Sequence, residues 1–561
     1  MISQNNLILK DLIWLLEIYW AGSYYRFSSE SISITNTFID GSTSIINFQG
    51  GLSQIDFSRS LSLFSVEPNR YSTAIEVVFP IDVAQQIQYG HDLAEADCEL
   101  SLMAIDDDYS NRDILLKGRV IDPEYGALDE PVTFSIESNL YETDIYIPQS
   151  SLVINKNTFD TLHLEHDDAE GDDTSVIGSV YPIVFGTPGN YRNITGGHSV
   201  GRGTPAYLVW KQETTEDSKI LLAGHHCYPD GGTIYILNTS AGNSDTAVIE
   251  NGYDDLNQEI CTTNLLLDAS AAYSSCTPEH GATYWVSWGF DQNDFTPAGG
   301  ISNKKHINYM SKAGEVLEYL LDQTGLEVDK PRFYTIMDYL NQYEISGYIS
   351  ERVKPLEWIT DNLLPILPVS ITVGTDGIYP ILWQSDVPSN SVQTLLTNGQ
   401  GCQRTSNVRY DRSNLANDIK LSFALNGESN EYLRYLKITA DEQVDVMVDR
   451  RIEYANTYVK ISQNRYGKKS KEITTDIVFE DTTAGLILSW MSKAFSFPTK
   501  TVSYSVDKKY LYLNIGDIVL LTDDELHITE KPCYVKRIKY DLISPDIELL
   551  IFEDPIRDSR I

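Results

Sequence analysis

Residues able to bind a metal ion gather in two segments of the chain. The first is His163-Leu-Glu165-His166-Asp167-Asp168-Ala-Glu-Gly-Asp172-Asp173, in which two histidines stand three residues apart among carboxylates that suit a divalent cation. It lacks the glycine and glutamate positions of an EF-hand, so we interpret it as a solvated acidic loop. The second is Gly224-His225-His226-Cys227. Because adjacent side chains of a strand point to opposite faces, its two imidazoles cannot share an ion without a bulge. We therefore predict no metal site.

Other patterns of catalysis and cofactor binding are equally weak. No G-x-S-x-G elbow, Walker A loop or G-x-G-x-x-G motif follows an expected strand. Gly201-Arg202-Gly203-Thr204 is too short to hold a phosphate and no helix follows it. Asp106-Asp107-Asp108 is typical of a solvated turn, and the basic run Arg465 to Lys471 is typical of a hairpin tip. We predict no catalytic residue, no cofactor and no enzyme activity.

The cysteines do not form a recognisable motif. None of the six belongs to a C-x-x-C pair, so neither a zinc knuckle nor a redox motif is indicated. Cys261 and Cys276 could form a disulfide in an oxidising environment, although buried free thiols are the simpler interpretation. The six positions are Cys98, Cys227, Cys261, Cys276, Cys402 and Cys533.

Charge and composition limit the class of protein. The 561 residues include 80 acidic and 42 basic residues, a formal net charge of −38. This excludes a broad basic surface for nucleic acid, because phosphate binding requires clustered Lys and Arg. Hydrophobic residues make up 42% and aromatic residues 11%, which predicts folded domains rather than an acidic disordered chain. At about 150 residues per domain, we expect three or four domains.

The apolar stretch Leu12 to Trp20 resembles a signal peptide only superficially. It contains Glu17, and a Tyr/Phe-rich segment follows it instead of a small-residue cleavage site. We expect a buried strand or short helix there. No run of about 18 uncharged apolar residues is present, so no membrane span is predicted.

Short alternating segments separated by turn signals predict a mainly β fold with minor α content. We expect antiparallel β-barrels or sandwiches plus a small α+β domain. The predicted domains are an N-terminal β-barrel-like domain at 1–150, an α+β middle domain at 151–190 and 309–400, an inserted small β module at 191–308, and a C-terminal β-barrel-like domain at 401–561 with one helix.

Helices are predicted where apolar residues recur at helical spacing. Val316, Leu317, Leu320 and Leu321 lie on one face of a helix expected over Lys312 to Thr324. A proline suits the first turn of a helix, which favours a start at Pro355. The full set is Ile81 to Gln88, Lys312 to Thr324, Phe333 to Gln342, Pro355 to Leu364 and Thr482 to Ala494.

Tyrosine is unusually frequent, with 35 Tyr against 17 Phe and 8 Trp. Its rigid apolar ring and polar hydroxyl suit surfaces buried in permanent assemblies, and they suit sugar-binding surfaces equally well. Tyrosine content therefore does not decide between the two.

Four groups of segments resemble the baseplate or tail-tip hub proteins of tailed bacteriophages and of gene transfer agents. Together they extend over most of the chain outside about 190 to 310. They are Gly118-Arg119-Val120 with Pro123-Glu-Tyr125-Gly126 and Val132 to Glu137; Tyr181-Pro182 with Phe185-Gly186; Gly347-Tyr348, Glu351-Arg352-Val353, Pro355 to Trp358 and Asp376 to Pro380; and Arg465-Tyr466-Gly467, Asp481 to Ala484 and Leu513 to Val519.

The resemblance implies a homotrimeric hub whose β domains form a pseudo-sixfold ring. Such a ring would join the tail tube or distal tail protein to a central spike or fibre in the virion, after assembly in the host bacterial cytoplasm. The acidic balance agrees with this prediction, because a tail lumen through which DNA slides without specific binding should not attract phosphate. We expect the N-terminal and C-terminal β domains to provide two similar contacts per chain.

Two alternatives remain from the sequence. The first is a β-rich glycan hydrolase, since 80 carboxylates leave room for a catalytic pair roughly 5–10 Å apart. The second is a host-receptor or carbohydrate-binding tail protein in contact with the cell surface, with the 191–308 insertion as the binding module.

Overall fold

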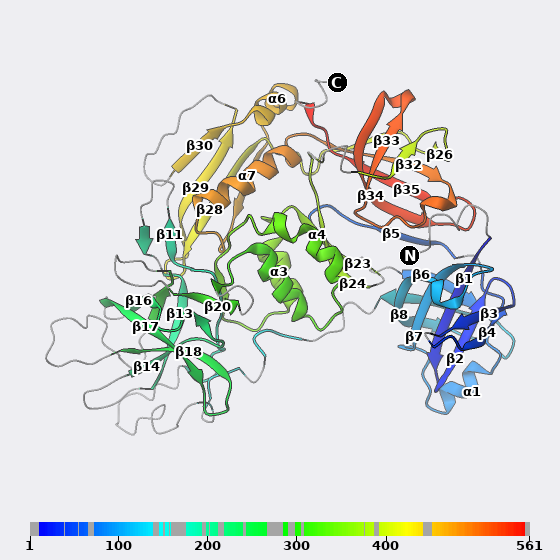
Figure 1. Ribbon diagram of the computed structural model, residues 1–561, viewed down its shortest axis with the longest axis horizontal. Helices are drawn as coiled ribbons and strands as arrows, with labels where there is room; N and C mark the ends of the chain where they lie inside the picture. Colours follow the sequence, from blue (N-terminus) through cyan, green and yellow to red (C-terminus); the bar gives the residue numbers. More distant parts are fainter. Residues whose placement is uncertain are drawn as a thin grey trace.

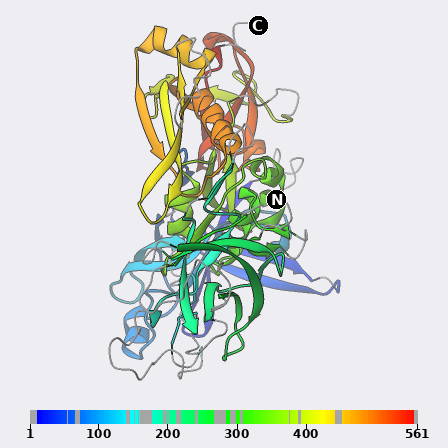
Figure 2. The ribbon, with the colours of Figure 1, turned by 90° about the vertical axis from the view of Figure 1, so that its left-hand side faces the viewer.

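The computed structural model of the protein contains several β-sheets arranged around a small group of helices. It describes residues 11–38, 40–53, 55–65, 72–138, 145–149, 152–155, 158, 176–192, 198–200, 202–210, 218–238, 243–265, 284–289, 298–303, 308–374, 376–385, 387, 392–440 and 451–555. Figure 1 shows the N-terminal strands and a small barrel at opposite sides, with α3 and α4 between them. The C-terminal sheets lie above, as the side view in Figure 2 also shows. The mainly β, multi-domain fold is confirmed.

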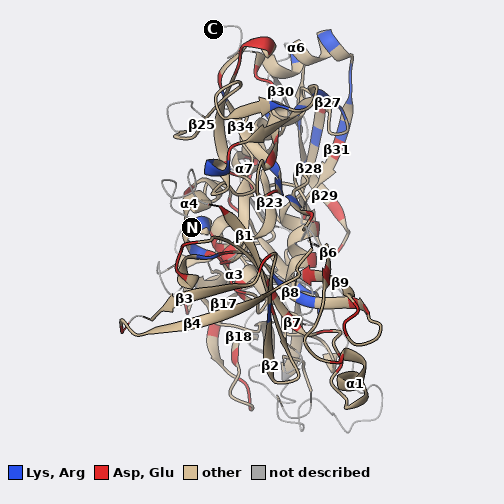
Figure 3. Ribbon diagram, turned by 90° about the vertical axis from the view of Figure 1, so that its right-hand side faces the viewer, with Lys and Arg blue, Asp and Glu red and all other residues tan. Residues whose placement is uncertain are grey.

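The N-terminal residues form an eight-stranded sheet in the order β3-β4-β2-β1-β7-β8-β9-β6. One face of β1 buries Trp14, Leu16 and Ile18 in the main core, which confirms a buried strand at Leu12–Trp20. The β3–β4 hairpin extends away from the rest of this sheet (Figure 3). The elements are β1 (Leu12–Trp20), β2 (Ser23–Ser28), β3 (Ile32–Thr37), β4 (Thr43–Gly50), β6 (Ser72–Val77), α1 (Val83–Gln88), β7 (Asp97–Ala104), η1 (Tyr109–Asn111), β8 (Asp113–Glu124) and β9 (Val132–Ser138).

One N-terminal strand belongs to a different sheet. Strand β5 (Phe57–Ser60) pairs antiparallel with β34 (Ile528–Tyr540) of the C-terminal sheet. Phe57 is fully buried and its ring stacks on Tyr540 at a centroid distance of 5.5 Å. The Arg59 side chain donates a hydrogen bond to the Leu115 carbonyl oxygen of β8. Strand β5 therefore connects the first and last β-sheets of the chain directly.

The middle of the sequence contains a closed barrel in the order β13-β14-β18-β17-β16-β19. Its interior is apolar and includes Ile220, Ile236 and Trp288, whose indole nitrogen donates to the Thr204 hydroxyl at 2.8 Å. The strands of this region are β10 (Ile183–Phe185), β11 (Asn190–Arg192), β12 (His198–Val200), β13 (Thr204–Trp210), β14 (Ser218–Ala223), β15 (Cys227–Tyr228), β16 (Thr233–Asn238), β17 (Asn243–Tyr253), β18 (Glu259–Leu265), β19 (Tyr284–Ser287), β20 (Gly299–Asn303) and β21 (Asn308–Tyr309).

Helices α3 and α4 pack in the centre of the molecule. Val316, Leu317, Leu320 and Leu321 of α3 are completely buried, as their helical spacing predicts. Asp329 caps α4 by accepting a hydrogen bond from the Arg332 amide, so this helix begins earlier than expected. The elements are α3 (Ala313–Asp322), α4 (Lys330–Leu340), β22 (Gly347–Ile349), α5 (Pro355–Trp358), the π-helix η4 (Ile359–Leu363), β23 (Val369–Gly374) and β24 (Gly377–Leu382).

The C-terminal part forms two sheets. One has the order β25-β33-β34-β35-β32-β26, and the other, β30-β29-β28-β31, contacts α7. The elements are β25 (Leu395–Thr397), β26 (Cys402–Arg404), β27 (Arg409–Asp411), β28 (Asp418–Asn426), β29 (Glu431–Thr439), β30 (Arg451–Ala455), α6 (Thr457–Tyr466), β31 (Ser470–Thr474), α7 (Asp481–Phe495), β32 (Thr499–Val506), η6 (Lys508–Tyr510), β33 (Ile518–Asp523), η7 (Asp524–Leu526), β34 (Ile528–Tyr540) and β35 (Asp546–Ile551).

Two local predictions in this part are wrong. The C-terminal part has two α-helices rather than one, because α6 begins at the cap Asn456 and ends before Gly467, whose φ is +72°. The run Arg465 to Lys471 is consequently the end of α6 and the start of β31, not a hairpin tip. Helix α6 has no apolar face that would indicate it in the sequence, because only Val459 and Ser462 among its residues are buried.

Among the described residues, no helix is both long and apolar enough to cross a bilayer. The boundaries of the four expected domains stay predictions.

Candidate functional site

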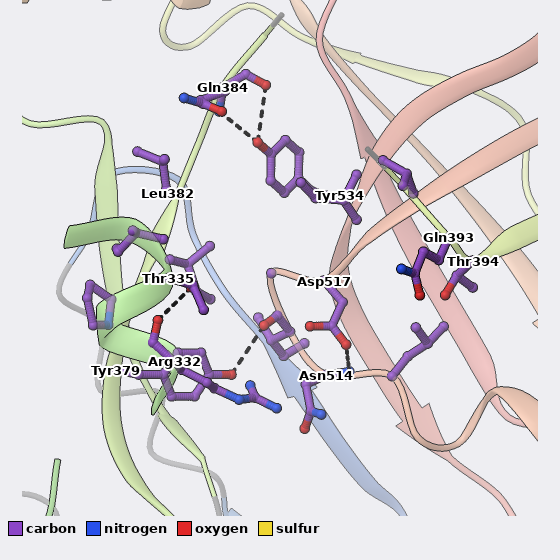
Figure 4. Close-up of a pocket in the computed structure, with 18 of the residues that line it drawn as sticks. Arg332, Thr335, Tyr379, Leu382, Gln384, Gln393, Thr394, Asn514, Asp517 and Tyr534 are labelled. Atoms are coloured by element: carbon purple, nitrogen blue, oxygen red, sulfur yellow. Dashed lines mark hydrogen bonds between the residues drawn. The ribbon is translucent and has the colours of Figure 1, made fainter. Parts of the chain in front are cut away.

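A cavity of about 550 Å³ lies where the central helices meet the C-terminal sheet. Figure 4 shows Arg332 and Tyr379 on one wall and Asn514 and Asp517 on the opposite wall. The lining comes from α4, β24, the segment before β25, the turn before β33, and β34. Its residues are Arg332, Thr335, Ile336, Tyr379, Pro380, Ile381, Leu382, Gln384, Val392, Gln393, Thr394, Tyr512, Leu513, Asn514, Ile515, Gly516, Asp517, Ile518 and Tyr534.

The first wall is held by Arg332 at the start of α4. Its Nε lies 3.3 Å from the Asp329 carboxylate, and its guanidinium lies over the Tyr379 ring at 4.6 Å from the centroid. The Tyr379 hydroxyl then donates to the Ile515 carbonyl oxygen of the other wall at 3.2 Å. These contacts fix the width of the cavity at this end.

The second wall contains a half-buried carboxyl group. Asp517 Oδ2 accepts a hydrogen bond from the backbone amide of Asn514 at 2.7 Å. Burial raises the pKa of Asp517 above its usual value, although that amide and the nearby Arg332 act in the opposite direction. Gly516 before it has φ +85° and lies close to Ile381, so a side chain there would meet both strain and a clash.

The chemistry available to this cavity is limited. Among the described residues that line it, Asp517 is the single carboxyl group, whereas glycoside hydrolysis ordinarily requires two. Most of the remaining wall is aliphatic or aromatic.

Replacing Asp517 by asparagine is expected to stabilise the protein at pH 7 by about 0.5–2 kcal/mol. Asparagine keeps the acceptor for the Asn514 backbone amide and removes the cost of a partly buried charge. Because burial raises the folded-state pKa, the native carboxyl loses stability as pH rises from its ordinary value of 3.8 through the folded pKa. The gain should therefore be largest at neutral pH and disappear near pH 4 in denaturant unfolding. The exposed control Asp524→Asn should show neither effect, and a destabilised Asp517→Asn protein at pH 7 would contradict this expectation.

The two metal candidates have different outcomes. The segment His163 to Asp173 lies outside the described residues. In the other, the Val184 amide donates to His225 Nε2 at 2.9 Å, and burial lowers the pKa of His225 to about 4. His226 instead packs against Tyr253 and its Nε2 lies 3.0 Å from the Gly252 carbonyl oxygen. In the part of the chain that the structure describes, no three His, Cys, Asp or Glu residues could hold a metal ion together.

The cysteines that the structure describes are free thiols. Cys98, Cys227, Cys261, Cys402 and Cys533 are all buried. Burial raises the pKa of the Cys227 thiol, which lies 3.7 Å from His225 Nδ1. Cys276, which could pair with Cys261 only in an oxidising environment, lies outside the described residues.

The acidic and basic runs have structural partners. Asp108 accepts hydrogen bonds from the Ser110 hydroxyl and from the Thr37 hydroxyl, each at 2.6 Å, and these lower its pKa. Arg465 pairs with Glu553 at 2.9 Å, and Lys468 pairs with Asp418 at 3.2 Å. Asp108, Arg465 and Lys468 therefore already take part in local hydrogen bonds and ion pairs.

The short glycine segment connects two parts of the molecule. Arg202 forms an ion pair with Glu428, and its carbonyl oxygen accepts from the Gly427 amide at 2.8 Å. Gly203 lies so close to the Pro188 backbone that no side chain fits there. The segment therefore attaches the barrel to the β28–β29 turn.

Sequence patterns did not identify the cavity between α4 and the C-terminal sheet. Its polar groups come from segments more than one hundred residues apart, and no local spacing connects them. The resemblance to hub proteins is the one sequence feature that points to Tyr379, Gly516 and Asp517, because its segments include them.

Comparison with known proteins finds a family match in the C-terminal part. Residues 443–537 match the family model "Putative phage tail protein", which reaches from before β30 into β34. No sequence among curated proteins matches the chain. Over this segment the chain is thus similar to phage tail proteins.

Several solved tail-protein structures align with nearly the whole chain. The tail protein from Neisseria meningitidis MC58 has 9% identity and a TM-score of 0.35, covering 97% of each chain. The 43 kDa tail protein of prophage MuSo2 from Shewanella oneidensis has 10% identity and a TM-score of 0.34, and the alignment covers 97% of each chain. Prophage tail protein gp18 from Listeria monocytogenes EGD-e has 10% identity and a TM-score of 0.29, and the alignment covers 98% of this chain and 96% of the Listeria chain. Scores this low do not establish a shared fold, so the family match alone bears on function.

Proposed function

We propose that this protein is a non-enzymatic structural component of a bacteriophage tail, acting as a baseplate or tail-tip hub. The observation that carries the proposal is the phage tail family match over residues 443–537. In this role the protein forms a homotrimer in the virion and joins the tail tube or distal tail protein to the central spike or fibre.

The connection between the first and last β-sheets supports a mechanical role. Strand β5 pairs with β34, and Lys539 Nζ lies 3.0 Å from the Asp56 carboxylate. If the chain transmits force between neighbouring tail proteins, its N-terminal and C-terminal β-sheets must move together, and the pairing of β5 with β34 holds them together. Three chains with two β units each would present six contacts, and a contact repeated by rotation closes into a ring when its angle suits the copy number.

The charge balance supports passage of DNA through such a ring. A net charge of −38 disfavours retention of phosphate at the wall. DNA would pass through the lumen without specific binding, and a basic inner surface on the assembled ring would contradict this part of the proposal.

Removal of the protein tests the assignment to the tail. Particles from a null mutant should show filled heads and no finished tails by negative-stain imaging, with recovery when the intact gene is supplied. Finished, infectious tails in its absence would overturn the proposal.

Sedimentation tests the trimer. The assembled species should have a mass of about 190 kDa, three times that of the 63.2 kDa chain, alone or with its tail neighbours. A stable dimer in solution and in the particle would contradict the ring, as would a monomer at every concentration that turns over a saccharide.

A further inference from the structure

A second cavity, of about 560 Å³, lies on the N-terminal sheet beside the β3–β4 hairpin. Its floor is the face of β1, β2, β7 and β8 that points away from the main core, and Asn36 and Ile46 of the hairpin form one side. Figure 3 shows the hairpin beside these strands. The volume falls within the usual range of small-ligand sites.

The floor is built around a buried carboxylate. The Glu17 side chain is only 7% exposed, and Arg26 Nε donates to its Oε2 at 2.7 Å. The Tyr109 hydroxyl donates to its Oε1. Arg112 lies over the Tyr109 ring at 3.9 Å from the centroid and pairs with Glu99 at 2.8 Å. These contacts hold the polar groups of the floor in place before any ligand arrives.

The rim carries two exposed aromatic rings. Tyr19 and Tyr24 face each other across β1 and β2, with ring centroids 5.0 Å apart. Their exposed fractions are 47% and 60%, and the Arg26 guanidinium lies 5.0 Å from the Tyr24 centroid. Exposed rings beside a polar floor offer an apolar surface for the C–H faces of a ligand and polar groups for its hydroxyls.

The charges around the cavity balance. Three carboxylates, Glu17, Asp97 and Glu99, line it together with three cations, Arg26, Arg112 and Lys117. This equality is unusual in a chain of net charge −38. A charged ligand group that contacts Glu17, Glu99, Arg26 or Arg112 would have to displace a pairing already made, whereas an uncharged polyhydroxyl ligand can hydrogen-bond to both signs.

We propose that this cavity binds a neutral saccharide of about two or three hexose units. Tyr19 and Tyr24 stack on its C–H faces, and the Glu99 carboxylate and Asn36 amide hydrogen-bond to its hydroxyls. The inference stands on the N-terminal sheet alone, whereas the family match behind the proposed function lies at residues 443–537.

Calorimetric titration of the full chain tests the proposal. Maltotriose, cellotriose and lactose serve as neutral probes, with digalacturonate and the glucosamine dimer as acidic and basic counterparts. We expect at least one neutral probe to bind, roughly tenfold weaker binding in Tyr24→Ala and in Tyr19→Ala, and retained binding in Tyr24→Phe, whose ring is intact. Tyr89→Ala is the matched control, because this tyrosine of the same domain is 66% exposed and lies outside the cavity.

Each contrary result overturns the site. These results are no binding of any neutral probe at millimolar concentration, binding of charged probes alone, or equal weakening in Tyr89→Ala. Loss of oligomer in Tyr24→Ala without a change in saccharide binding would assign the tyrosines to a contact between chains instead. Circular dichroism and thermal unfolding of each variant show whether it is folded. The hub proposal is unaffected by any of these outcomes, because the null mutant and the sedimented mass test it.

Discussion

Replacing Phe57 by alanine is expected to lower the free energy of unfolding by about 3–5 kcal/mol, the usual cost of removing a buried aromatic side chain. Phe57 is completely buried, stacks on Tyr540 and lies in a strand of only four residues. The loss should affect the C-terminal sheet, although the substitution is in the N-terminal part of the sequence. Denaturant unfolding followed by hydrogen exchange of the β34 amides measures both effects.

Phe38 provides the matched control for this substitution. It is the same residue type in the same domain, but 49% exposed at the β3–β4 hairpin. Phe38→Ala should change stability by less than about 0.5 kcal/mol, as is usual at the surface. If Phe57→Ala were equally mild, or if β34 kept its protection, the pairing of β5 would contribute little to holding the two sheets together.

Replacing Asp481 by alanine is expected to lower the free energy of unfolding by about 3–5 kcal/mol, because it removes a buried carboxylate that forms an ion pair with Arg434. Arg434 Nη2 lies 2.6 Å from Asp481 Oδ2, and the two side chains are 10% and 1% exposed. The pair connects β29 to the first turn of α7, where an acidic residue also favours the helix dipole. Tryptophan fluorescence during denaturant unfolding would follow the loss, since Trp490 lies on α7.

Two further variants separate the ion pair from general damage to this sheet. Glu472→Ala removes an exposed carboxylate that lies 3.7 Å from Lys420 and should cost less than about 1 kcal/mol. The double replacement Arg434→Met with Asp481→Leu should recover most of the stability, since apolar residues of similar volume often replace buried ion pairs without loss. Failure of the double variant to improve on Asp481→Ala would show that the effect does not come from an uncompensated charge.

Local patterns were reliable where one face of an element is apolar. Helix α3 follows directly from the spacing of Val316, Leu317, Leu320 and Leu321, and α7 lies within one residue of its expected limits. Helix α6 was missed for the opposite reason, because its side chains are mostly polar and its ends depend on Asn456 and Gly467. Strand β5 was also missed, since Phe-Ser-Arg-Ser has only one apolar residue to indicate burial.

The candidate sites could not be predicted at all from spacing. The cavity between α4 and the C-terminal sheet brings together Arg332, Tyr379 and Asp517. None of the three belongs to a sequence motif that would indicate a site. Tyr19 and Tyr24 are close in sequence, but Asn36 and Ile46, which line the same cavity, come from the later β3–β4 hairpin.

The sequence by itself determined the mainly β character, the amphipathic helices and the strongly acidic charge, because these depend on composition and on neighbours a few residues apart. The tertiary structure alone decided the pairing of β5 with β34, where Asp56 meets Lys539 across 483 positions, and the balanced charges beside Tyr19 and Tyr24. Pairing across such a distance is selected by the packing of completed sheets, whose contacts do not exist until the chain has folded.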